Sequence, residues 1–294
     1  MKEIFAILGG DARQLALASC LAATGAEVRS FGLPQELLPT TVLSFFDWEC
    51  AVEGADTVLL PIPASPDGVR IHMPLATTET APTFSELFFA LPKEARLMGG
   101  KFPPSVRAQA EECGRTVFDY CKSEIFLQKN AIPTAEGAVA ILMERETRTV
   151  RGLPVAITGY GRVAGALARL LVAMGAEVTV GARRQSALLA AAAAGCRTAK
   201  LCDAASVSAL CEGKAAVFNT VPHWIFTGEV LATIPKSTLL IDLASAPGGI
   251  DAEAARGRGL SVIWALSLPG KYAPATAGEI IADTVLDFLT QEEI

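Results

Sequence analysis

The stretch PVAITGYGRVAGALARLLVAMGAEVTVGARR, residues 154–184, decides the fold class of this chain. It opens with a short apolar run and continues through a turn that has glycine at positions 159 and 161. An alanine- and leucine-rich helical segment follows, and then a second β-like run. This order of strand, turn, helix and strand predicts the first unit of a doubly wound α/β domain.

A second copy of the pattern lies 150 positions earlier, where ILGGDARQLALASCLAATGAEV aligns with ITGYGRVAGALARLLVAMGAEV. The repeated feature is a strand, a turn and a helix. Further strand-like runs follow each copy: EVRSFG, TVLLPIP, ARLMGG and TVFDY in the first half, and EVTVG, AAVFN, TLLID and LSVIWA in the second. We therefore expect an α/β protein with two Rossmann-like domains, each a parallel sheet flanked by helices, and a cleft between them.

The domain boundaries follow from changes in composition. We assign 1–133 to a degenerate Rossmann-like domain for substrate or partner, and 134–150 to a connecting helix with Thr134 as its N-cap. Because ERETRTVRG is strongly polar, the second domain is placed at 151–272. Residues 273–294 predict an amphipathic helix that packs back toward the N-terminal domain. Its expected buried face is Ile280, Ile281, Val285 and Leu289.

Composition excludes several classes of function. The chain has 294 residues, of which 51% are hydrophobic, and a net charge of −6, which disfavours nucleic-acid and anionic-membrane partners. Every apolar run is interrupted well before the roughly 20 residues of a membrane span, and we expect a cytoplasmic protein. Seven cysteines without a CxxC pair, and only two histidines, predict reduced thiols and no bound metal.

The glycine turn predicts a dinucleotide site. Gly159 permits the tight turn, Gly161 lets the backbone approach a pyrophosphate, and small Ala164 lets the helix lie close to the strand. Amides at the start of the helix would face the phosphates. A glycine turn that binds nothing is the alternative. The residues expected to contact the dinucleotide are Gly159, Tyr160, Gly161, Arg162, Val163, Ala164, Arg183 and Arg184.

The end of the second strand predicts which dinucleotide binds. Gly181 stands where an NAD enzyme places an acidic residue for the ribose hydroxyls, and Arg183 and Arg184 follow it. Two guanidinium groups and no carboxylate favour a 2′-phosphate, so we expect NADP. The alternative is that both arginines are solvated surface residues.

The first copy departs from the pattern. Asp11 stands in the place of Gly161, and Gln14 in the place of Ala164. An acidic side chain would repel phosphates, and Gln would hold the helix away from the strand. We therefore expect the first copy to have no nucleotide and to bind substrate, with Arg13 either receiving a carboxylate or forming a surface salt bridge with Asp11.

Several stretches together resemble the A subunit of dipicolinate synthase, an enzyme of bacterial sporulation. They are IFAILGGDARQ, NAIPTAEGAVAILM, ITGYGRVAGALARLL, VTVGARR, FNTVP, IDLASAPGGID and LPGKYAPATAGEII, in order from near Ile4 to near Ala282. The most specific are IDLASAPGG and LPGKYAPATAGEI, because the glycine turn alone indicates only a dehydrogenase.

The resemblance implies a fold similar to 2-hydroxyacid and alanine dehydrogenases. It implies oxidation of hydroxy-tetrahydrodipicolinate, or its dehydrated dihydro form, to pyridine-2,6-dicarboxylate with reduction of NADP. It also implies a B subunit that resembles flavin-binding proteins, and a place in the mother cell of a sporulating bacterium. We further expect a homo-oligomer.

For the chemistry, we expect hydride transfer in the cleft between the domains. By analogy with related dehydrogenases, Asn219, Thr220, Val221 and Pro222 would lie beside the nicotinamide ribose. Asp242 and Ser245 would approach the nicotinamide, although Asp242 at a strand end could instead cap a turn.

The substrate carboxylates call for cationic or amide donors. The candidates are Arg13, Ser65, Lys271 and the helix N-terminus at Thr134. Ser65 could instead stabilise its proline-rich turn, and Lys271 could be an exposed loop lysine. For proton transfer the candidates are Glu136 and His223. Glu136 could instead serve the helix dipole, His223 could be an ordinary half-buried histidine, and a bound water could transfer the proton.

Two other functions compete with this one. An NADP-dependent dehydrogenase of a 2-hydroxy or 2-amino acid would keep the fold, but such enzymes place a paired imidazole near the nicotinamide, and His223 is the only sensible one here. The other is a non-catalytic nucleotide-binding partner chain. Activity of the isolated protein would separate the two.

Overall fold

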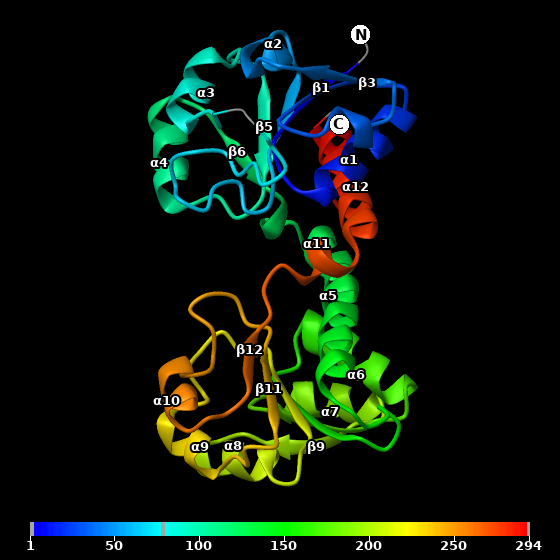
Figure 1. Ribbon diagram of the computed structural model, residues 1–294, viewed down its shortest axis with the longest axis vertical. Coiled ribbons are helices and arrows are strands. Elements are labelled where there is room, and N and C mark those ends of the chain that lie inside the picture. The colour runs from blue at the N-terminus through cyan, green and yellow to red at the C-terminus, as the bar shows by residue number, and fades with distance from the viewer. Residues whose placement is uncertain (1–2, 78–79, 293–294) are drawn as a thin grey trace. The chain divides into compact units, whose positions relative to one another are not determined.

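The computed structural model describes residues 3–77 and 80–292 and divides into two compact units, both shown in Figure 1. Unit 1 comprises Met1–Asn130 and Ala273–Ile294, and unit 2 comprises Ala131–Tyr272. Within the described residues, no helix is long and apolar enough to cross a membrane.

Unit 1 is built on a parallel six-stranded sheet of order β3-β2-β1-β4-β5-β6. Its strands are β1 (Ile4–Leu8), β2 (Glu27–Phe31), β3 (Val42–Phe45), β4 (Thr57–Leu59), β5 (Arg96–Gly99) and β6 (Val117–Asp119). Its helices are α1 (Ala12–Ala23), α2 (Trp48–Val52), α3 (Phe84–Ala90), α4 (Pro104–Glu112) and α12 (Pro274–Glu292), with the 3₁₀ turns η1 (Gln35–Leu37) and η2 (Tyr120–Lys122).

Unit 2 repeats this arrangement with the order β12-β11-β10-β7-β8-β9. Its strands are β7 (Pro154–Thr158), β8 (Glu177–Ala182), β9 (Arg197–Lys200), β10 (Ala216–Asn219), β11 (Leu239–Asp242) and β12 (Val262–Trp264). Its helices are α6 (Arg162–Ala173), α7 (Gln185–Ala193), α8 (Ala204–Cys211), α9 (Gly228–Thr233), α10 (Ala252–Gly257) and α11 (Leu268–Tyr272). The order of both sheets is that of the dinucleotide-binding fold, and the predicted fold class is confirmed.

The repeat seen in the sequence has the same registration in space. β1 and α1 of unit 1 correspond residue by residue to β7 and α6 of unit 2 at the offset of 150. The inner strands are continuous apolar runs, because helices cover both sheet faces. Ile7 and Ile157, which the alignment pairs, are both completely buried.

One edge strand in each sheet, β3 and β9, was not predicted from the sequence. β9 is the run RTAK, in which Arg197, Thr198 and Lys200 are exposed, so it lacks the apolar pattern that marks the inner strands. β3 has only Val42 fully buried. An edge strand is solvated along one side, and its sequence therefore resembles that of a loop.

The predicted connecting helix was wrong at its N-terminus. The observed helix α5 spans Glu124–Arg145 and contains Pro133, so Thr134 and Glu136 lie in its interior. A proline there removes one backbone hydrogen bond, but Ala131 and Ala135 on either side of it are buried, and their burial maintains the helix. Thr134 is therefore not an N-cap, and no helix N-terminus is available there to bind a carboxylate.

The C-terminal helix α12 packs against α1 within unit 1, as the red and blue helices of Figure 1 show. Ile280, Ile281 and Val285 are buried in a cluster with Leu17 and Leu21 of α1, and Leu289 is partly buried beside them. The two helices come into backbone contact at Gly278.

We expect Gly278→Ala to destabilise unit 1. A Cβ at Gly278 would lie 2.4 Å from the carbonyl oxygen of Arg13 and 2.5 Å from Cβ of Ala16, and these atoms cannot move without separating the helices. Overpacking of this kind costs about 1 to 3 kcal/mol, which exceeds the gain of about 1 kcal/mol in helix propensity. Chemical denaturation measures the difference. Gly257→Ala, where a Cβ meets no atom within 4 Å, is the matched control and should not destabilise the chain.

Candidate functional site

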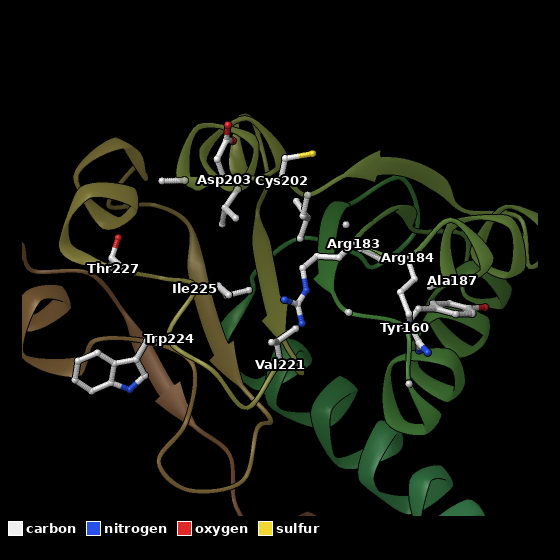
Figure 2. Close-up of a pocket in the computed structure, with 17 residues that line it drawn as sticks. Tyr160, Arg183, Arg184, Ala187, Cys202, Asp203, Val221, Trp224, Ile225 and Thr227 are labelled. Atoms are coloured by element: carbon white, nitrogen blue, oxygen red, sulfur yellow. The ribbon is translucent and has the colours of Figure 1, made fainter.

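A pocket of about 610 Å³ opens in unit 2 at the carboxyl ends of its strands (Figure 2). Three segments form its floor and one side: the glycine turn 159–161 after β7, residues 181–184 at the end of β8, and residues 201–204 after β9. Ligands of open α/β sheets bind at this edge, next to the point where the strand order reverses. The remaining lining residues are Ala187, Val207, Val221, Trp224, Ile225 and Thr227.

The glycine turn leaves the start of α6 open. Gly159 has φ +83°, and a Cβ there would lie 2.7 Å from Oγ1 of Thr220, so only glycine fits. Gly161 is the N-cap of α6, no side chain caps this helix, and a Cβ at Gly161 would meet no atom within 4 Å. An uncapped helix N-terminus beside empty space is a binding site for an anion such as a pyrophosphate.

The equivalent turn of unit 1 is closed by its own polar groups. Oδ1 of Asp11 accepts a hydrogen bond from the amide of Arg13 at 3.0 Å, and Oε1 of Gln14 accepts from the amide of Asp11 at 3.0 Å. The amide of Gly10 donates to the carbonyl of His72 at 2.9 Å. The donors that would bind a phosphate are therefore already occupied.

A methionine fills the space that a nucleotide would need in unit 1. A Cβ at Gly9 would lie 2.3 Å from Cγ of Met73, and one at Gly32 would lie 2.4 Å from Cε of the same side chain. Met73 therefore packs directly on the turn after β1 and on the end of β2. Together with the capped helix, this explains physically why the first copy does not bind nucleotide.

The end of β8 has no room for the acidic residue of an NAD site. A Cβ at Gly181 would lie 2.5 Å from Cδ2 of Leu210 and 3.1 Å from Leu201. Arg183 and Arg184 follow, both exposed and both lining the pocket. In the view of Figure 2, Arg183 reaches toward Val221 and Arg184 lies beside Tyr160. Lys200 donates to the carbonyl of Arg183 at 2.6 Å and fixes the backbone there.

The opposite wall of the pocket was not predicted from the sequence. Cys202 and Asp203 follow β9, and Trp224, which is 56% exposed, lies on the loop after β10. Oδ1 of Asp203 accepts from the amide of Ser206 at 2.9 Å as the N-cap of α8, and this bond lowers the pKa of Asp203 below its usual value. Because β9 was not recognised, the position of the loop after it could not be predicted.

Half of the predicted cofactor residues line the pocket: Gly159, Tyr160, Gly161, Arg183, Arg184 and Val221. Arg162, Val163 and Ala164 form the first turn of α6, where Ala164 is completely buried against the sheet, as its small size predicts. Pro222 is beyond Val221 and does not line the pocket. Thr220 donates its hydroxyl to the carbonyl of Thr158 at 2.7 Å, so its side chain joins the ends of β7 and β10.

Asn219 is the centre of a buried hydrogen-bond network. Its Oδ1 accepts from the hydroxyl of Thr158 at 2.7 Å and from the amide of Val221 at 3.1 Å. Its Nδ2 donates to Oδ1 of Asp242 at 2.8 Å and to the carbonyl of Val221 at 3.1 Å. All the hydrogen-bonding capacity of this amide is used inside the protein. Asn219 therefore orients the loop that carries Val221.

Asp242 holds a turn, which was one of its two predicted roles. Besides Asn219, its carboxylate accepts from the amide of Ala244 at 3.0 Å and from the amide of Gly249 at 2.8 Å, and the residue is 3% exposed. Ser245 in this turn is exposed, and its carbonyl accepts from Gly248 at 2.8 Å. These contacts support a positioning role for Asp242.

In unit 1, Arg13 pairs with Asp11, but not at the surface. Arg13 is 6% exposed and bonds Oδ1 of Asp11 through Nε at 2.9 Å and Oδ2 through Nη2 at 2.8 Å. Nη2 also donates to the carbonyl of Ile62. Burial alone would raise the pKa of Asp11, but the bonds and charge of Arg13 outweigh it and hold that pKa below 3.8. Most of the Arg13 fork is thus occupied.

Ser65 stabilises its turn. Its hydroxyl donates to Oδ1 of Asp67 at 2.8 Å and accepts from the amide of Gly68 at 2.9 Å, and the residue is 3% exposed. The same carboxylate accepts from two further amides, and these bonds hold the pKa of Asp67 at about 2. The alternative given for Ser65, a structural role in the turn, is the one that these contacts support.

The other predicted site residues of unit 2 are exposed. Glu136 lies on α5 and Lys271 on α11, and the two helices touch where a Cβ at Gly137 would lie 2.9 Å from Leu268. Nζ of Lys271 lies 4.9 Å from the centre of the Tyr272 ring. His223 is exposed, not half-buried, and follows Val221 by two residues. None of the three lines the pocket.

Two further residues of unit 1 stand out only in the structure. Burial lowers the pKa of His72, with Asp11 raising it and Arg13 lowering it further, so this imidazole lies beside the Asp11–Arg13 pair. Lys101 has φ +53°, which is unusual outside glycine. Its signal in the sequence was the GGK that directly follows the strand RLM.

No set of three or more His, Cys, Asp or Glu side chains in the described part of the chain is arranged to hold a metal ion.

Comparison with other solved structures bears on the fold. The chain matches L-alanine dehydrogenase with a TM-score of 0.65 and 12% identity, covering 96% of this chain and 88% of the other. It matches D-lactate dehydrogenase of Escherichia coli with a TM-score of 0.60 and 13% identity, covering 99% and 97%. At these identities the likeness shows the fold alone, and it agrees with the relationship implied by the sequence.

Two family comparisons divide at the same place as the chain. Residues 4–121 match the family described as the N-terminal domain of the dipicolinate synthase A subunit. Residues 154–246 match the family described as NADP oxidoreductase coenzyme F420-dependent. The second match covers the glycine turn and the pocket, and indicates an NAD(P)-binding oxidoreductase domain.

Two relatives match over nearly the whole chain. The sequence is 29% identical to the dipicolinate synthase A subunit of Bacillus subtilis (strain 168), over 97% of this chain and 95% of that protein. The crystal structure of the dipicolinate synthase A subunit from Bacillus halodurans matches with a TM-score of 0.89 and 30% identity, over 98% and 97%. The chain belongs to the family of dipicolinate synthase A subunits.

Proposed function

We propose that this chain is an NADP-dependent oxidoreductase that oxidises dihydrodipicolinate, or its hydrated precursor hydroxy-tetrahydrodipicolinate, to pyridine-2,6-dicarboxylate in sporulation. The observation that carries the proposal is the contrast between the two repeats. The helix of unit 2 is uncapped beside a pocket, whereas the equivalent helix of unit 1 is capped and covered. The substrate follows from membership of the family.

The pocket fits a dinucleotide bearing a 2′-phosphate. Its start at Gly161 supplies backbone amides for the pyrophosphate. Its far end carries Arg183 and Arg184, where Gly181 leaves no space for a carboxylate. Arginine forks match the geometry of a phosphate.

The reaction balances with NADP as the oxidant. Dihydrodipicolinate loses one hydride and one proton, which gives the aromatic product, NADPH and a proton, and the hydrated precursor first loses water. When bound, NADP supplies the hydride acceptor. The protein has to orient the ring and remove one proton. In unit 2, His223 is the better candidate for that proton, because it lies two residues beyond Val221 of the pocket.

The family also supports a second polypeptide in the enzyme. The relative from Bacillus subtilis is named as one lettered chain of its enzyme, and that name implies at least one other chain. We propose the flavoprotein-like B subunit for this role, in the mother cell.

The test of the proposed function is the conversion of freshly generated hydroxy-tetrahydrodipicolinate with NADP, by this chain alone and together with B. Product and NADPH should appear in equal amounts, because each substrate molecule delivers one hydride. Tight NADP binding without any turnover by the pair would refute the proposed substrate.

Replacing Arg183 or Arg184 by Ala should weaken NADPH binding by roughly 1 to 3 kcal/mol for each lost charge-assisted contact. NADH binding should change little, because NADH lacks the 2′-phosphate. Fluorescence titration with both cofactors measures this. Arg197→Ala, on the exposed edge strand β9 and outside the pocket, is the matched control. Equal weakening of NADPH and NADH would show that the arginines do not bind the 2′-phosphate.

A further inference from the structure

The loop Gly99–Phe102 of unit 1, between β5 and α4, holds a lysine in an unfavourable backbone conformation. Lys101 has φ +53°, a region that glycine adopts more easily than any residue with a side chain. Glycine is available in this loop and is used where it is needed. A Cβ at Gly99 would lie 2.7 Å from the Phe102 ring, and one at Gly100 would lie 2.3 Å from Ile62.

The surrounding protein enforces this conformation. The amide of Lys101 donates to Oδ1 of Asp119 at 3.1 Å, and the amide of Cys121 donates to the same oxygen at 3.0 Å. Asp119 is 6% exposed, and its other oxygen bonds the guanidinium of Arg107. A strained residue that buried groups hold in place is a feature of functional sites.

Hydrogen bonds join this loop to the loops after β4 and β1. The amide of Ala64 donates to the carbonyl of Gly100 at 2.7 Å, the amide of His72 to the carbonyl of Ala64 at 2.9 Å, and the amide of Gly10 to that of His72 at 2.9 Å. β1 and β4 are the strands between which the sheet order of unit 1 reverses. In open α/β sheets this carboxyl edge is where ligands bind.

The charges at this edge favour an anion. Arg13 and Arg107 are each bonded to a carboxylate, Asp11 and Asp119 respectively, so these two pairs cancel. Lys101 is exposed, and no carboxylate pairs with it among the described residues of unit 1. α4 begins three residues later with Pro103 and Pro104, and no side chain caps it. A free ammonium beside an uncapped helix N-terminus attracts a carboxylate.

We propose that Lys101, together with the N-terminus of α4, binds one carboxylate of the dicarboxylate substrate, which rests on the substrate class proposed above. Lys101 is a binding residue in this scheme. Arg13 and Asp119 are positioning residues that act through the loops. The side chain explains why lysine is kept where glycine would be less strained.

The test is a binding measurement on the full chain saturated with NADPH. Pyridine-2,6-dicarboxylate and pyridine-2-carboxylate are titrated by calorimetry into the natural protein, Lys101→Gly, Lys101→Arg and the control Lys93→Gly, an exposed lysine ahead of β5. We expect Lys101→Gly to lose about tenfold or more in affinity for the dicarboxylate. The preference for two carboxylates over one should disappear in this variant, and Lys101→Arg should recover part of it.

The melting temperature and the NADPH affinity separate binding from folding. Lys101→Gly should melt no lower than the natural protein, because glycine adopts this φ readily, and its NADPH affinity should be unchanged. An unchanged dicarboxylate affinity in a folded Lys101→Gly would overturn the role of Lys101 alone. A natural protein that binds NADPH but neither pyridine acid would overturn the proposed substrate, and the role of Lys101 with it.

Discussion

Replacing Gly161 by Asp is expected to abolish NADP(H) binding while leaving the fold intact. The substitution gives unit 2 the residue that unit 1 carries at the equivalent Asp11. The backbone of Gly161, at φ −93° and ψ −165°, is open to any residue, and a side chain there meets no atom within 4 Å. The new carboxylate would cap α6 and face the phosphates with a like charge.

Fluorescence titration should detect no binding of NADPH at about 100 times the natural dissociation constant, which corresponds to a loss of at least about 2.7 kcal/mol. The free energy of unfolding should stay equal or rise by about 0.5 to 2 kcal/mol, because an aspartate N-cap stabilises a helix. Gly161→Ala is the control, since its methyl group adds volume without charge. If the Asp and Ala variants bound NADPH equally well, the phosphates would not lie at this helix N-terminus.

The second large effect is expected from Asp242→Ala, which should lower the free energy of unfolding by about 3 to 5 kcal/mol. The substitution leaves three buried donors without an acceptor: Nδ2 of Asn219 and the amides of Ala244 and Gly249. Chemical denaturation of the full chain measures the loss. NADPH binding should weaken as well, because Asn219 orients the loop that carries Val221 of the pocket.

Asp242→Asn separates positioning from catalysis. Its amide oxygen can replace one carboxylate oxygen, but its NH₂ group then faces a backbone donor, so we expect an intermediate loss of stability. For a positioning residue, activity and stability should fall together, and the pH profile of kcat should keep its shape. A variant of natural stability with no turnover and an altered pH profile would make Asp242 a catalytic residue.

The nucleotide site was predictable as far as it depends on short sequence patterns. Gly159, Gly161 and Ala164 are required by a turn and a close helix that occupy consecutive residues, and Arg183 and Arg184 directly follow the strand that presents them. The wall of Cys202, Asp203 and Trp224 was not predictable, because the edge strand before it is solvated and has no apolar signature.

The roles of single polar residues were less accessible. Asp242 and Ser65 are residue types that serve both catalysis and turns, and only their hydrogen-bond partners distinguish the two uses. Pro133 was treated as the end of a segment, although burial on either side of it keeps α5 continuous. Lys101 drew no attention, since a backbone dihedral angle cannot be read from residue types.

The sequence by itself determined the repeat, the order of strands and helices within it, and the copy that carries a complete glycine turn. Periodicity and glycine spacing are local properties, and they follow from backbone sterics and from burial of one face. The tertiary structure alone decided how the first copy is closed. His72 and Met73, more than 60 residues from Gly10 in the chain, cover its turn. Only long-range packing brings such groups together, and no local pattern encodes it.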